Sequence, residues 1–80
     1  MKEDKELREE FLAIRDKYIG AMICVDTIYR IDSEYERFFI ENDMRDVKFK
    51  IEVSDKGGVI ELVPLNTMSR FVIRGILNEE

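Results

Sequence analysis

The first part of the chain carries apolar side chains at helical spacing. Steps of four, three and four residues separate Leu7, Phe11, Ile14 and Tyr18. These steps place the four side chains on one face of a helix. Acidic residues in the first turn suit the positive end of the helix dipole, and Gly20 marks the point where the helix stops. The pattern predicts a helix over residues 3–18 that packs one face against the rest of the domain.

Beyond Gly20 the pattern changes to a period of two. In AMICVDTIYRI, residues 21–31, both faces are apolar at the start and one face becomes polar towards the end. This is typical of a strand that enters the middle of a sheet. Cys24 fits there as a small buried hydrophobic side chain rather than as a nucleophile.

The next stretch, residues 32–41, allows two interpretations. Ser33 and Glu36 have the spacing of a capping box, which opens a helix with Tyr35 and two phenylalanines on it. Alternatively, Asp32 and Ser33 turn a hairpin, and residues 34–41 return as a second strand. The strand-like flanks favour the hairpin.

A second hairpin follows. VKFKIEVS alternates, with Val47, Phe49, Ile51 and Val53 inward and Lys48, Lys50 and Glu52 outward. DKGG at 55–58 supplies residues that tolerate the backbone dihedral angles of a tight turn. VIELV then forms the strand that pairs with the first. Pro64 lacks a donor and therefore marks an edge, a bulge or a strand end.

The last segment, SRFVIRGIL at 69–77, alternates Phe71 and Ile73 against Arg70, Val72 and Arg74, and it is interpreted as a further strand. The expected structure is therefore one domain of residues 1–80. Its class is α+β and mostly β: a helix at 3–18, then antiparallel strands within 21–77. The sheet is expected to have four or five strands and to be strongly bent, as in a small SH3-type barrel.

The amino-acid composition excludes several kinds of catalytic and metal site. The chain has 80 residues, a formal net charge of −5, one cysteine and no histidine. Histidine-assisted catalysis and an ordinary zinc site are therefore excluded, and we expect no metal and no other cofactor. Four aspartates near turns are the best acid/base candidates, but their spacing supports no enzyme; they are Asp26, Asp32, Asp43 and Asp46.

The location expected from the sequence is intracellular, in the cytoplasm or nucleus. The charged start, MKEDKELREE, is not a signal peptide, and no apolar run approaches membrane-spanning length. We expect no membrane partner.

Three stretches together resemble the Sm-like (LSm) proteins, and the similarity covers residues 7–75. FVIRG at 71–75 is similar to the family's second motif, an aliphatic residue followed by Arg-Gly. IENDMRDVKF at 40–49 is similar to the end of the first motif, and IEVSDKGGVIEL at 51–62 falls where the family has its third strand, variable loop and fourth strand.

The resemblance implies a non-catalytic, RNA-binding subunit of a ring of like or related subunits, as in an oligomeric ribonucleoprotein. Single-stranded RNA would be read at the pore. Arg74 and Gly75 match the RNA-contacting Arg-Gly, and Met44 matches the methionine of a Met-Asn pair. Arg45 stands where the family has the asparagine, so it would contact phosphate by charge. Only five residues follow Gly75, which leaves a short fifth strand for ring closure.

The residues alone leave the role of Arg74 and Gly75 open. An arginine at a strand end can lie against a base, with glycine giving close access; it can equally point to solvent, with glycine at a bulge. The alternative function is a small acidic protein-interaction module, an adaptor or inhibitor, that binds a protein through a sheet edge or an acidic face. The most exposed acidic residues would then be Glu3, Asp4, Glu6, Glu9 and Glu10.

Overall fold

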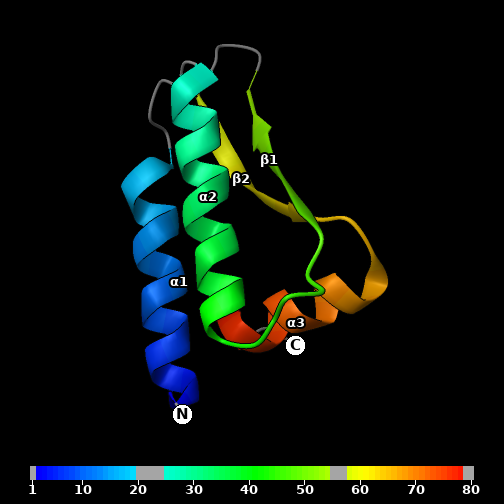
Figure 1. The fold of residues 1–80 in the computed structure, drawn as a ribbon. Coiled ribbons are helices and arrows are strands. Elements are labelled where there is room, and N and C mark those ends of the chain that lie inside the picture. Colours follow the sequence, from blue (N-terminus) through cyan, green and yellow to red (C-terminus); the bar gives the residue numbers. More distant parts are fainter. Residues whose placement is uncertain (1, 20–24, 55–57, 79–80) are drawn as a thin grey trace.

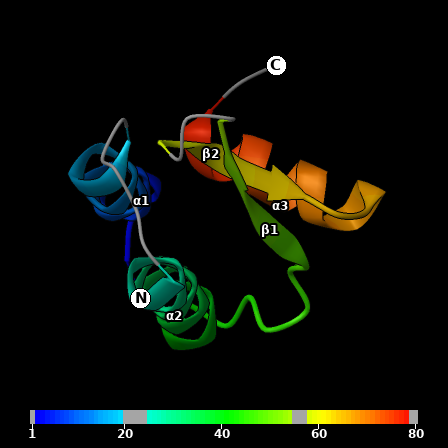
Figure 2. The ribbon, with the colours of Figure 1, turned by 90° about the horizontal axis from the view of Figure 1, so that it is seen from above.

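The fold consists of a helical hairpin, a two-stranded hairpin and a third helix. The computed structural model describes residues 2–19, 25–54 and 58–78. The elements are α1 (Asp4–Tyr18), α2 (Val25–Glu41), β1 (Phe49–Val53), β2 (Val59–Pro64) and α3 (Thr67–Leu77). Figures 1 and 2 show α1 and α2 antiparallel and side by side, the strand pair beside them, and α3 across one end of the molecule. No helix of the described residues is long and apolar enough to cross a membrane.

The core forms where the two helices of the hairpin meet the sheet. Helix α2 contributes Ile31, Tyr35, Phe38 and Phe39, all at most 4 % exposed, at the spacing of one helix face. Phe11 of α1 lies in the middle of this cluster, with its ring centroid 5.4 Å from that of Tyr35 and 5.8 Å from that of Phe38. Edge-to-face and tilted pairs of this kind add to the gain from burial. The aromatic cluster therefore holds the two helices together.

The ends of α2 and α1 are fixed by polar contacts. After α2, Asp43 adopts a left-handed backbone with φ of 59°; its N–H donates to the carbonyl of Ile40, and that of Met44 donates to the carbonyl of Phe39. This is a Schellman motif in which aspartate replaces the usual glycine. At the other end of the hairpin, Lys17 of α1 forms an ion pair with Glu34 of α2 at 3.0 Å.

The strands β1 and β2 are antiparallel neighbours, and Phe49 lies opposite Pro64. The predicted second hairpin is therefore confirmed, and Pro64 ends its strand as expected. Val47 is buried and Phe49 and Ile51 are half-buried, but Val53 is 40 % exposed next to a register irregularity. Turn residues 55–57 lie outside the described residues.

Helix α3 is linked by the buried side chain of Ser69 to the segment just before β1. Asn66 caps the helix, because its side-chain oxygen accepts from the N–H of Ser69 at 2.7 Å. The hydroxyl oxygen of Ser69, which is fully buried, accepts from the N–H of Lys48 at 2.7 Å. Together with Ile73 and Ile76, Ser69 forms the buried face of the helix. This face fixes the direction in which the other side chains of α3 point.

The expected bent sheet of four or five strands is wrong. The N-terminal helix is present, but 25–41 is helix rather than two strands, and 67–77 is helix rather than a strand. Residues 21–24, including Cys24, lie outside the described residues. The capping-box alternative was closer, since Tyr35 does lie on a helix, although this helix begins at Val25 and Ser33 lies inside it. The small barrel that the Sm-like resemblance implied is therefore absent from the described residues.

Candidate functional site: an arginine-lined groove

A groove lies where α1, α2, β2 and α3 meet. Its volume is about 330 Å³, and three arginines from two helices line it. They are Arg15 of α1 and Arg70 and Arg74 of α3. The groove is therefore a convergence of cations on a chain whose net charge is −5.

Helix α3 places two of these arginines next to each other. Arg70 and Arg74 are four residues apart, and side chains at this spacing are neighbours on a helix surface. Both are exposed. Within the described residues neither forms an ion pair with a carboxylate. Among the described residues, no carboxylate therefore occupies these two guanidinium groups.

The third arginine has unused hydrogen-bonding capacity. Arg15 forms an ion pair with its neighbour Asp16, with 3.6 Å between Nε and the carboxylate oxygen. This distance is too long for a hydrogen bond, and the buried Nε of Arg15 has no hydrogen-bond partner among the described residues. A buried donor without a partner is costly. Arg15 therefore keeps one unused hydrogen-bond donor among the described residues.

Tyr35 of α2 also lines the groove. Burial raises the pKa of the Tyr35 hydroxyl to about 12, although the positive charge of Arg15 acts in the other direction. The phenol is therefore neutral at physiological pH, and it can donate a hydrogen bond while carrying no charge. Tyr35 therefore adds no negative charge to the lining of the groove.

Glu61 of β2 also lines the groove and is the one acidic residue among its described lining residues. In the sheet it lies directly opposite Glu52 of β1, and like charges in such a pair are unfavourable. No described cation is close enough to Glu61 to form an ion pair. The arginines outnumber this carboxylate three to one, so the groove keeps a positive excess.

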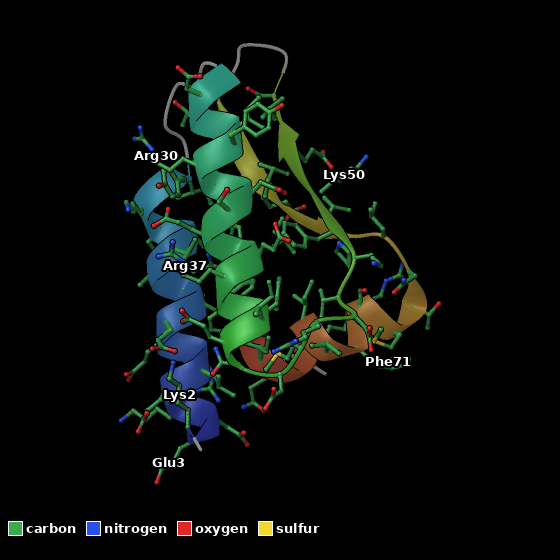
Figure 3. All side chains as sticks on the ribbon, in the orientation of Figure 1. Lys2, Glu3, Arg30, Arg37, Lys50 and Phe71 are labelled. Atoms are coloured by element: carbon green, nitrogen blue, oxygen red, sulfur yellow. The ribbon has the colours of Figure 1, made fainter. Side chains whose placement is uncertain are left out.

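Charge is divided unequally between the elements. Helix α2 contains five acidic and two basic residues, whereas α3 contains two arginines and no acidic residue. Figure 3 shows Arg30 and Arg37, the basic residues of α2, on the helical hairpin and away from α3. The α2 side of the helical hairpin is therefore acidic, and the groove with α3 forms a basic region beside it.

The structure distributes the residues predicted from the sequence over three depressions. Arg74 lines the groove. Gly75 and Met44 line a neighbouring depression between α3 and the start of α1. Arg45 lines a third, together with Lys48. Arg45 and Arg74 were expected to converge at an RNA-binding pore, and the structure places them in different depressions.

Sequence reasoning missed Arg15, Arg70, Tyr35 and Glu61 as groove residues. The pair Arg70–Arg74 had a usable signal, because a spacing of four residues is one helical turn and the same segment repeats Ser69, Ile73 and Ile76 at helical steps. The contribution of Arg15 had no such signal, since it depends on how α1 packs against α3.

Chemically, this arrangement suits the recognition of an anion. Guanidinium groups stay protonated in proteins, and their planar donors match carboxylate and phosphate oxygens. The floor of the groove is apolar and includes Phe11 and Ile73, which are 2 % and 6 % exposed. A bound anion would thus sit over a dry surface, where charge-assisted hydrogen bonds are stronger than in water. Searches with this sequence and fold found no matching protein family, no matching curated protein and no matching solved structure.

Proposed function

We propose that this chain is a small non-catalytic protein-interaction module whose arginine-lined groove binds an acidic segment of a partner protein. The observation that carries the proposal is the meeting of Arg15, Arg70 and Arg74 at one groove, two of them without an ion-pair partner in the described part of the chain. Arginine is favoured at interfaces because its fork of donors pairs with carboxylates in two-point contacts.

A protein partner fits these charges better than a nucleic acid. Nucleic-acid binding needs a basic surface that follows a chain of phosphates, and here the basic region is short. Five carboxylates of α2 and Glu61 within the groove would repel a long polyanion. A short acidic segment needs only the groove itself.

The pore-based mechanism of the Sm-like proteins is not carried forward. It depends on a bent barrel that closes into a ring, and the strands of this chain that are described form one two-stranded sheet. Arg74 retains a role in the present proposal, but as part of a helix surface rather than of a pore loop.

The proposal is tested with an unbiased set of ligands. A displayed library of random 12-residue peptides is selected on the immobilised protein, and the winners are synthesised and titrated by calorimetry at moderate salt. We expect aspartate and glutamate to be enriched in the selected peptides. Peptides without acidic enrichment, or no selection above a protein-free control, would contradict the proposal.

Charge variants then locate the binding site. Replacing Arg70 and Arg74 by glutamine removes two charge-assisted contacts. Each is worth about 1.5 kcal/mol, the lower limit for hydrogen bonds to charged groups, so the affinity should fall about 100-fold. The matched control is the double variant Arg30→Gln and Arg37→Gln, which changes the net charge by the same amount but on α2. It should have little effect on the affinity for the peptide. Glu61→Gln removes the opposing carboxylate and should strengthen binding.

An RNA titration separates the two classes of partner. Oligouridylate is the probe, at the same salt concentration as the peptides. If it binds more tightly than the best peptide and loses that affinity in the Arg70/Arg74 double variant, the groove is a nucleic-acid site and the proposal is wrong.

A further inference from the structure

The outer side of α3 exposes apolar side chains beside its arginines. Phe71 is 68 % exposed and Met68 is 45 % exposed, and Leu65, just before the helix, is 57 % exposed. Figure 3 shows Phe71 on α3 at the periphery of the molecule, away from the helical hairpin. A single exposed apolar residue is unremarkable on a protein surface, but three within seven residues form a patch.

Three rows of side chains run along α3, each at steps of three or four residues. Ser69, Ile73 and Ile76 form the buried row. Arg70 and Arg74 form a basic row at the groove. Met68 and Phe71, three residues apart, form an apolar row on the outer side, and Gly75, one turn beyond Phe71, ends this row beside the depression between α3 and the start of α1. Since Phe71 is one turn from Arg74, the apolar row borders the groove.

Gly75 leaves open space at the end of the apolar row. A Cβ atom added at this position would have no neighbour within 4 Å, so packing within the described chain does not require glycine here. Glycine inside a helix is unfavourable relative to alanine. A bare backbone one turn from Phe71 gives an incoming chain room to approach closely.

From these observations we infer that the apolar row of α3 is the second half of the docking surface, and that the partner's acidic segment carries a large apolar side chain that packs on Phe71. This inference rests on the proposed function and specifies its ligand as an acidic segment with an apolar anchor. Charge complementarity selects this occupant, because α3 has two arginines and no acidic residue. An aromatic residue flanked by arginines has the composition of an interface hot spot.

The test is a thermodynamic cycle on Phe71. The probes are the tightest peptide from the random library and a derivative in which its largest apolar residue is alanine. We expect Phe71→Ala to weaken binding of the parent peptide at least tenfold and to change binding of the derivative less than twofold. Tyr29→Ala is the matched control, because Tyr29 is an equally exposed aromatic residue, 71 % exposed, on α2; it should change neither affinity.

The outcomes separate this inference from the proposed function. If the selected peptides are acidic and need Arg70 and Arg74, but Phe71→Ala has no effect, the groove stands and the apolar anchor is wrong. If Phe71→Ala instead lowers the mass of the peptide-free protein in light scattering, a second copy of the chain covers the patch and the inference is overturned. Circular dichroism of Phe71→Ala should match the parent, since the side chain is mostly in solvent.

Discussion

Replacing Ser69 by alanine should destabilise the fold more than any other serine substitution of this chain. Ser69 is fully buried, and its oxygen accepts the N–H of Lys48 at 2.7 Å. The substitution leaves the cap from Asn66 intact, because that bond uses the backbone N–H of residue 69. It removes one acceptor and leaves one partly buried donor unpaired, at a cost of about 1–3 kcal/mol. The higher helix propensity of alanine returns about 0.5 kcal/mol.

The net loss of about 0.5–2.5 kcal/mol is a sizeable part of the stability of this chain, since a domain of 80 residues has a total stability of about 4–12 kcal/mol. It corresponds to a fall of about 2–20 °C in the melting temperature for a domain of this size. Urea unfolding and thermal melts followed by circular dichroism measure both quantities. Ser33→Ala is the control, because Ser33 is exposed on α2 and the same change there should be neutral or slightly stabilising. Equal stabilities of the two variants would refute the role given to Ser69.

Three further predictions concern the core, a helix and pH. Phe11→Ala removes the ring at the centre of the aromatic cluster and should cost about 3–5 kcal/mol, measured by urea unfolding; a loss below 1 kcal/mol contradicts that position. Gly75→Ala should stabilise the fold by about 0.5–1 kcal/mol, seen as a higher melting temperature, and an unchanged or lower one would show that the space is not free. Burial would raise the pKa of Glu34, but neighbouring groups, among them the Lys17 ammonium 3.0 Å from its carboxylate, outweigh burial and hold that pKa below its usual 4.5. The unfolded chain therefore takes up this proton first, and stability should decrease as the pH falls below about 4.5. Glu34→Gln should flatten that part of the pH–stability curve, and an unchanged curve counts against the contact.

The sequence predicted the helix α1 and the hairpin of β1 and β2 because each has one clear period. In α1, four apolar residues repeat at steps of four and three; in β1 the lysines alternate with apolar residues. In each case one periodicity applies over the whole element. The element bounds then agree with the prediction to within two residues: 3–18 was expected for α1, and Asp4–Tyr18 is observed.

Helix α2 was missed because its first turns are also compatible with a strand. β-branched residues such as Thr27 and Ile28 favour strands, and the turn-forming pair Asp32–Ser33 suggested a break. The helical signal was present further along, where Ile31 and Tyr35 begin a buried face. Burial against Phe11 outweighs the local preference, and that contact joins residues far apart in sequence.

Helix α3 was missed because its segment also fits a strand. Its helical conformation is what brings the two arginines of the candidate site together. A strand period of two and a helix period of 3.6 both fit a segment as short as SRFVIRGIL. Two interactions of this helix involve residues outside that segment: the cap from Asn66 and the hydrogen bond between Ser69 and Lys48. In a strand, Val72 would lie between Arg70 and Arg74 on the same face. In the helix the two arginines are direct neighbours on one side, and Val72 lies on another side.

The buried row of α3 determines where its basic row and its apolar row point. Ser69 and the two isoleucines fix the rotation of the helix about its axis, and this rotation directs the arginines to the groove and Phe71 to solvent. Folding alone would favour a polar residue in place of Phe71 and alanine in place of Gly75. An exposed aromatic residue lowers solubility, and a glycine inside a helix lowers stability. Two arginines four residues apart on one helix repel each other, and neither has an ion pair among the described residues. Binding of the proposed partner would give all three features a common purpose. The variants of α3 should then separate stability from affinity: Ser69→Ala should lower stability, Phe71→Ala should lower affinity, and Gly75→Ala should raise stability while filling the space proposed for the partner.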